Sequence, residues 1–205
     1  MKKQSIAILF TILMLPFYFL SAETKNTTNL ETAIVAGGCF WCIEADFEKL
    51  NGVEDVISGY IGGHVKNPTY KQVSSGLSGH IEAIKITYNP TLVSYSQILD
   101  HFWKNIDPTR NDGQFCDYGK QYRPAIFYLD SHQKSKALKS IEKTTANKPF
   151  TDPLKVELIQ AGTFYLAESY HQDYYKKNPI RYRFYRYNCG RDDRIKELWK
   201  NNHKK

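Results

Sequence analysis

Residues 32–50 read TAIVAGGCFWCIEADFEKL and contain the change of pattern that decides the fold. The run TAIVA (32–36) is short and apolar, as in a strand, and Gly37-Gly38 ends it. From Cys39 onward apolar residues recur at helical spacing, until Asn51-Gly52 stops the pattern. We therefore expect a strand, a glycine turn and a helix, with Cys39 at the start of the helix.

The rest of the chain interleaves strand-like and helix-like segments with short links, and Ser94 is a suitable helix cap. This order predicts an α+β fold, a two-layer sandwich around a mixed or antiparallel sheet with a ferredoxin-like core and an irregular C-terminal tail. The expected strands are 53–63, 80–88, 124–130 and 155–160, and the expected helices are 94–105, 131–146, 164–177 and 192–200.

The N-terminus has the pattern of a secretory signal peptide. A basic start and an apolar stretch from Ile6 to Leu20 precede small residues at Ser21-Ala22. Pro16 interrupts this stretch, which is short for a bilayer span, so a retained anchor is the weaker alternative. We expect an exported protein, periplasmic or secreted, with a signal peptide at 1–22, a disordered leader at 23–31 and a single catalytic domain at 32–205.

The formal charge of +7 is spread along the chain and favours solubility over nucleic-acid binding. One basic and aromatic cluster, RYRFYRYN (181–188), has the composition to stack on a single strand. No nucleic-acid motif accompanies it, so we favour a segment that packs on the domain through its tyrosines. We expect a monomer without a nucleic-acid partner.

Cys39 is the candidate nucleophile, because the free amides and dipole at a helix start stabilise a thiolate and lower its pKa. The alternative is a small buried cysteine with no reactivity. Only Cys39 and Cys42 are paired in sequence, while Cys116 and Cys189 are distant, so we expect no metal site. A thioredoxin-like disulfide exchanger shares the Cys-x-x-Cys helix start and remains the alternative function.

Glu82 is the candidate acid. In HIEAIKITY (80–88) the strand period places Glu82 on the same side as Ile84, Ile86 and Tyr88, toward the apolar core. Burial there would raise its pKa and keep it protonated near neutral pH. The alternative is an ordinary carboxylate at the rim of the sheet. Glu168 and His171 have the spacing of a di-iron ligand pair, but a second pair is missing, so we expect a surface helix face.

Several motifs together resemble the peptide methionine sulfoxide reductase family, A type. The resemblance extends in order from Thr32 to Pro179. It combines a GCFW stretch, a GH-x-E strand and a QYR loop, and thioredoxins have no counterpart to the strand or the loop. The matching stretches are GGCFWCIEADF, SGYIGGHVKNPTY, GHIEAIKITYNP, DHFWKNIDPT, DYGKQYRPAIFY and YHQDYYKKNP.

The resemblance implies a two-layer α+β fold and reduction of methionine-S-sulfoxide, free or in oxidised proteins and peptides. It implies no cofactor beyond an external dithiol reductant, such as a thioredoxin-like protein. By position, Cys39 looks like the nucleophile and Glu82 the acid that protonates the sulfoxide oxygen. The other implied roles are Phe40 and Trp41 as the wall for the S-methyl group, Tyr70 and Tyr122 as hydroxyls on the oxygen, and Asp117 as a carboxylate for the substrate amide.

Two departures from the family pattern concern recycling. Cys42 stands where glycine is common after GCFW, and RYRFYRYNCGRDDRIKELW replaces a glycine-rich C-terminal stretch. We expect Cys189 to be the main resolving thiol, because a tail with few apolar anchors can move toward Cys39. Cys42 is the runner-up and Cys116 the third candidate.

Overall fold

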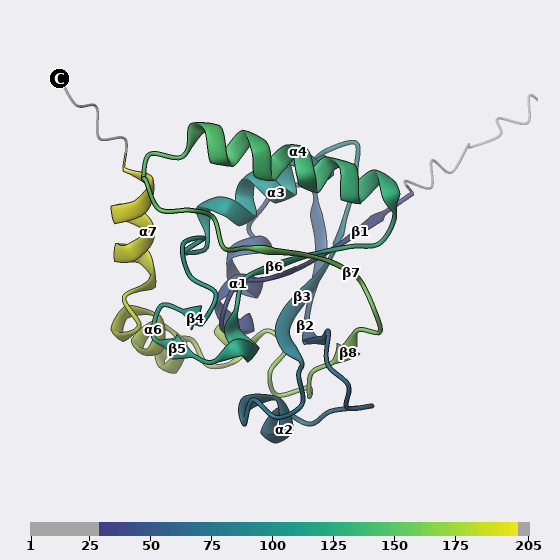
Figure 1. Cartoon of the computed structure of the whole chain (residues 1–205). Helices are drawn as coiled ribbons and strands as arrows, with labels where there is room; N and C mark the ends of the chain where they lie inside the picture. The colour runs from purple at the N-terminus through teal and green to yellow at the C-terminus, as the bar shows by residue number, and fades with distance from the viewer. Residues whose placement is uncertain (1–28, 201–205) are drawn as a thin grey trace, which may run out of the picture.

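A six-stranded mixed sheet forms one layer of the protein, in the order β7-β6-β1-β3-β2-β8 (Figure 1). The computed structural model describes residues 29–200. Neighbouring strands run antiparallel except for β6 and β7, which are parallel. The strands are β1 (Glu31–Ala36), β2 (Val53–Ile61), β3 (Ile81–Tyr88), β6 (Ala125–Tyr128), β7 (Glu157–Gln160) and β8 (Tyr165–Leu166), and a separate hairpin joins β4 (Gly113–Gln114) to β5 (Asp117–Tyr118).

The central strands follow the chain order β1-α1-β2-β3-α3-β6 and lie in the sheet as β6-β1-β3-β2. This split βαβ arrangement confirms the predicted α+β sandwich with a ferredoxin-like core. The helices are α1 (Phe40–Phe47), α2 (Tyr70–Ser74), α3 (Tyr95–Lys104), a 3₁₀ turn η1 (Lys120–Tyr122), α4 (Ser131–Asn147), α5 (Tyr174–Lys177), α6 (Pro179–Asn188) and α7 (Arg191–Trp199).

The alternation of side chains along β1 builds a core on each face of the sheet. Ala33 and Val35 pack with Ile43 of α1 and Leu99 of α3 in the larger core. The neighbouring positions of β1 join a smaller cluster with Phe127 on the opposite face. Figure 1 shows α3 and α4 over the sheet and α6 beside the β4–β5 hairpin.

Local chemistry sets the start of α3, as the sequence predicts. The Ser94 side chain accepts a hydrogen bond from the Gln97 amide, and Gln97 reaches back to the Ser94 amide. This capping box satisfies amides that the first helical turn leaves free.

The predictions for the C-terminal third are wrong in two places. Residues 164–177 do not form one helix, because Tyr165 pairs with Tyr60 at the edge of the sheet and only the short α5 follows. The expected irregular tail is helical instead. Pro179 occupies the first turn of α6, a position that needs no amide hydrogen, and Gly190 at φ 66° separates α6 from α7.

The expected signal peptide lies outside the described residues, as does most of the expected leader, although Glu31 is already part of β1. Between residues 29 and 200, helices are too short or too polar to cross a membrane.

Candidate active site

Cys39 lies at the start of α1, as the sequence predicts, directly after the glycine turn. It is the N-cap residue, and its carbonyl accepts hydrogen bonds from the Cys42 and Ile43 amides. Gly38 has φ 88°, and a Cβ atom there would lie 2.6 Å from Cβ of Gln114. Only glycine fits this approach, so the turn that precedes Cys39 lies close against the β4–β5 hairpin.

The charge state of Cys39 differs from the prediction. Cys39 is 7% exposed, and burial raises the pKa of its thiol, with further contributions from Cys42 and from the charges of Glu82 and Asp117. The helix start is therefore insufficient to make Cys39 a thiolate in the resting protein. The pKa of Cys42 is lowered, first by a hydrogen bond with Cys39. Both are free thiols.

Glu82 lies on the core side of β3, as the strand period predicts, and is buried. Its Oε2 accepts a 3.1 Å hydrogen bond from the Phe40 amide. Burial raises the pKa of Glu82 to about 8, while this hydrogen bond acts in the opposite direction. The alternative of an exposed rim carboxylate is excluded, and the carboxyl retains a proton at neutral pH.

Tyr70, Tyr122 and Asp117 gather around the same point, although they come from α2, η1 and β5. Burial, together with the charges of Glu82 and Cys39, raises the pKa of Tyr70 to about 12. Burial likewise raises the pKa of Tyr122, with Glu82 and Tyr70 as the next causes. These mutual effects place two hydroxyls near the acid and the thiol.

Asp117 faces Cys39 from the β4–β5 hairpin and is half-buried. Its two carboxylate oxygens accept hydrogen bonds of 2.8 and 2.7 Å from the Tyr185 hydroxyl. Burial raises the pKa of Asp117, and the hydrogen bond from Tyr185 opposes this effect. The side chain is therefore held as an oriented hydrogen-bonding group beside the thiol.

Trp41 provides a partly exposed aromatic surface next to Cys39, whereas the ring of Phe40 is almost completely buried. Trp41 stacks on Tyr174, with ring centroids 3.7 Å apart and an angle of 6° between the planes. Its indole N–H donates a 3.0 Å hydrogen bond to Nδ1 of His171. The Phe40 ring packs against His171 at 5.0 Å, so the two residues form a fixed apolar layer. Their predicted contact with a substrate methyl group stays a prediction.

The prediction that Glu168 and His171 lie on the surface face of a helix is wrong. Residues 167–173 form a turn segment outside any helix, and His171 is buried against Trp41 and Phe40. Glu168 accepts hydrogen bonds of 2.8 Å each from the Tyr60 hydroxyl and the Tyr70 amide. Sequence reasoning missed these roles, although His171 and Tyr174 lie in the matching stretch YHQDYYKKNP.

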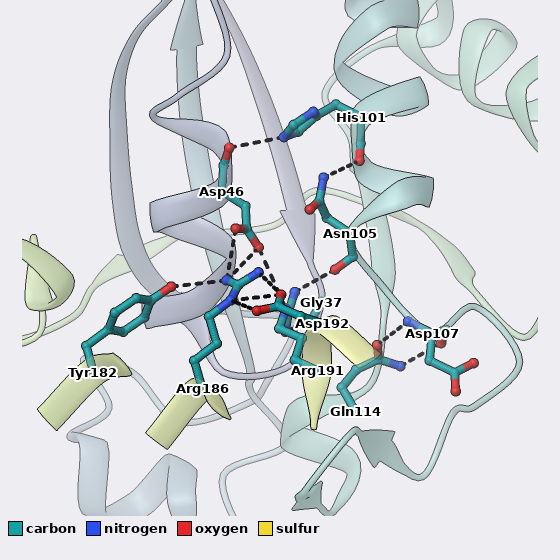
Figure 2. Close-up of polar contacts among 10 residues, drawn as sticks. All are labelled: Gly37, Asp46, His101, Asn105, Asp107, Gln114, Tyr182, Arg186, Arg191 and Asp192. Atoms are coloured by element: carbon teal, nitrogen blue, oxygen red, sulfur yellow. Dashed lines mark hydrogen bonds and ion pairs between the residues drawn. The ribbon is translucent and has the colours of Figure 1, made fainter. Parts of the chain in front are cut away.

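A charged network fixes the C-terminal helices behind α1 (Figure 2). Arg186 contacts Asp46 at 2.9 Å and Asp192 at 2.6 Å. Arg191 is 1% exposed and donates to the Gly37 carbonyl at 3.2 Å. Arg186 holds α6 against α1 and Arg191 holds α7 against the glycine turn, so the wall around Cys39 depends on residues near the C-terminus.

Cys116 and Cys189 are joined by a disulfide that spans 73 residues. Cys189, the predicted resolving residue, thus has Cys116 as its partner in this structure, while the Cys39-x-x-Cys42 pair stays reduced. The thioredoxin-like alternative, in which the Cys-x-x-Cys pair would be the working disulfide, is not favoured. Which thiol first reacts with Cys39 stays a prediction.

Two groups among residues 29–200 have ligand atoms close enough for a metal ion, and neither fits one well. In the first, Cys116 and Cys189 are bonded to each other, so their sulfurs are not thiolate ligands. In the second, Lys176 already lies 2.6 Å from Glu48 and 2.8 Å from Asp173.

Comparison with known proteins agrees with the site. The sequence profile described as peptide methionine sulfoxide reductase matches residues 31–203. The peptide methionine sulfoxide reductase MsrA/MsrB of Vibrio cholerae is 53% identical over 88% of this chain, and this chain spans about half (50%) of its length. Peptide methionine sulfoxide reductase MsrA 2 of Caulobacter vibrioides is 50% identical over 87% of this chain and 90% of its own length.

Solved structures show the same fold. Reduced Mxr1 from Saccharomyces cerevisiae has a TM-score of 0.69 and 28% identity, covering 74% of this chain and 87% of its own. Mxr1 in complex with Trx2 has 19% identity and a TM-score of 0.50, covering 71% of this chain and 84% of its own. At that identity the second likeness concerns the fold alone.

Proposed function

This chain belongs to the peptide methionine sulfoxide reductase family, and from that membership we propose that it reduces methionine-S-sulfoxide, free or in oxidised proteins, to methionine. The observation that carries the proposal is the approach of a free cysteine, Cys39, to a buried protonated acid, Glu82. A sulfoxide oxygen leaves readily only when it is protonated, so the reaction needs both groups together.

The acid form of Glu82 also assists the nucleophile. The charge of ionised Glu82 is one of the causes that raise the pKa of Cys39, and protonation of Glu82 removes it. Cys39 releases its thiol proton to solvent, and the thiolate attacks the sulfoxide sulfur while Glu82 donates its proton to the oxygen. The sulfur–oxygen bond of the substrate breaks, the hydroxyl group is transferred to Sγ of Cys39, and Glu82 takes up a new proton from solvent. Tyr70 and Tyr122 hold that oxygen, Asp117 orients the substrate amide and Trp41 receives the methyl group. The products are methionine and a sulfenic acid on Cys39.

Recycling uses thiols and no prosthetic group. A second cysteine condenses with the sulfenic acid, releasing water and forming a disulfide. A thioredoxin-like dithiol protein then supplies the two electrons. Yeast Mxr1, which shares the fold of this chain, has been solved in complex with Trx2, and this supports a thioredoxin-like donor. The Cys116–Cys189 disulfide is the bond that such a donor would reduce.

The test compares wild type with Cys39→Ser on the two separated sulfoxide epimers, with dithiothreitol as reductant. Turnover of the S epimer that is lost in the variant supports the proposal. Reduction of insulin disulfides without sulfoxide turnover would support a disulfide exchanger instead. Asp100→Ala, an exposed change on α3, is the control for handling of the protein.

We further propose that the enzyme is exported and works in an oxidising compartment. The basic and apolar pattern of residues 1–22, followed by small residues at its end, supports this. N-terminal sequencing of the protein from the periplasm or medium tests it. A mature protein that begins at Met1 and stays in the cytosol would contradict export.

A further inference from the structure

The disulfide Cys116–Cys189 is asymmetric in its exposure. Cys116 is exposed, whereas Cys189 is half-buried at the end of α6. Gln114 pairs with Asp117 in the β4–β5 hairpin, so Phe115 and Cys116 form its two-residue tip. The Phe115 ring is buried under the Arg191 guanidinium at 4.5 Å, which fixes the tip. Cys116 is therefore presented to solvent on a rigid support.

The two sulfurs also differ in their hydrogen bonding. The backbone amide of Cys116 donates a 3.2 Å hydrogen bond to Sγ of Cys189. When a thiolate attacks a disulfide, negative charge develops on the sulfur that leaves. An N–H directed at Cys189 stabilises that charge, so the geometry favours attack at Cys116 with Cys189 as the leaving group.

Exposed apolar side chains lie on both segments that this disulfide joins, the β4–β5 hairpin and α6. Tyr118 lies two residues after Cys116 and is 70% exposed, with the Arg110 guanidinium 5.1 Å from its ring. On α6 the outward face has the helical spacing of an apolar stripe, defined as Ile180, Phe184 and Tyr187, which are 77%, 70% and 81% exposed. A surface of this kind beside a reactive group is typical of a protein contact.

The charge around the apolar stripe indicates the kind of partner. Arg181 and Arg183 are exposed on the same helix, and α6 contains no carboxylate. The stripe therefore fits a partner with an apolar contact surface and an acidic rim.

We propose that electrons enter at Cys116, from a thioredoxin-like dithiol protein that docks on Tyr118 and the apolar stripe. One partner thiolate attacks Sγ of Cys116, the Cys116–Cys189 bond breaks, and Cys189 leaves as a thiolate. The second partner thiol then attacks the mixed disulfide, which releases Cys116 as a thiolate and leaves the partner oxidised. The two electrons come from the partner dithiol. This inference rests on the proposed function for the identity of the electron donor.

Trapping maps the attacked sulfur. The oxidised protein is mixed with a thioredoxin whose second active-site cysteine is serine, quenched in acid, alkylated and digested with trypsin. Cleavage separates the two cysteines into peptides 111–120 and 187–191. We expect the thioredoxin peptide on Cys116 and the alkyl group on Cys189. Thioredoxin found mainly on Cys189 would overturn the assignment.

Reduction rates test the docking surface. The rate constant for reducing the preformed disulfide is measured with intact thioredoxin and with dithiothreitol, and their ratio is compared between variants. Phe184→Ser with Tyr187→Ser should lower this ratio about tenfold, as loss of interface anchors does. Leu138→Ser, an exposed leucine on α4, is the matched control with the wild-type ratio. An unchanged ratio in the double variant would overturn the docking surface.

Neither measurement uses a sulfoxide. Failure of this inference is therefore distinguishable from failure of the proposed reductase activity, which the Cys39→Ser comparison tests separately.

Discussion

The amide of Phe40 donates a 3.1 Å hydrogen bond to the carboxyl group of Glu82, across the gap between α1 and β3. Phe40 directly follows Cys39, so this contact fixes the distance between the nucleophile and the acid. The amide needs only an acceptor oxygen, which leaves the second oxygen of Glu82 free to carry the proton.

Glu82→Gln should slow the sulfoxide step by roughly 10²–10⁴-fold, because the amide keeps the acceptor for Phe40 but cannot give up a full proton. Single-turnover formation of methionine measures the step. Alkylation of Cys39 is the control for an intact site. A variant within about threefold of wild type, a barrier change under about 1 kcal/mol, would contradict the role of Glu82.

The sulfoxide step should decline as pH rises through about 8. Burial raises the pKa of Glu82 from 4.5 to about 8, so its acid form is lost above that value. By the same shift, the stability contributed by the neutral carboxyl is fully present below pH 4.5 and is lost as pH rises through about 8. The single-turnover rate is measured across this pH range and divided by the Cys39 alkylation rate. Both rates depend on the Cys39 thiolate, so the ratio reports the acid form of Glu82. Glu82→Gln should abolish the decline, and an equal decline in the variant would assign it to another group.

Cys189 should resolve the sulfenic acid on Cys39. When reduced Cys116→Ser protein reacts with excess substrate in the absence of reductant, mass spectrometry should find a Cys39–Cys189 bond, since Cys189 then lacks its partner. Cys189→Ser should cycle poorly with thioredoxin. A Cys39–Cys42 bond in the wild type, together with normal cycling of Cys189→Ser, would identify Cys42 as the resolving thiol.

Asp46→Ala should destabilise the fold by about 3 kcal/mol, because it leaves Arg191 and Arg186 without their shared carboxylate. Denaturant unfolding measures the free energy. Asp100→Ala is the matched control, since its pair with Lys143 is exposed and is worth under about 1 kcal/mol. Equal losses in the two variants would show that the network in Figure 2 contributes little.

Local signals predict most of the fold correctly. The run 32–36, the helix after Cys39 and the capped helix at Ser94 are set by periodicity and by neighbours in the chain, and all three are confirmed. Glu82 is also predicted to face the core, because the period of a strand fixes the side of each residue.

The remaining features depend on contacts between distant residues. The two residues of β8 form a strand only because β2 offers an open edge. Four cysteines allow three pairings, and spacing does not choose Cys116 with Cys189. The raised pKa of Cys39 follows from burial by chain segments that the local sequence around it does not contain.

The stacking of Trp41 on Tyr174, and the docking of Arg191 against Gly37, have a consequence for biosynthesis. A chain is made from its N-terminus, so the nucleophile leaves the ribosome long before the residues that enclose it. Until α5, α6 and α7 are made, Trp41 lacks Tyr174 and the glycine turn lacks Arg191, so Cys39 is an accessible thiol on an incomplete domain. In that interval the Cys39 thiol is open to reaction with oxidants and with other cysteines. The complete active site forms only when the C-terminal helices pack against α1.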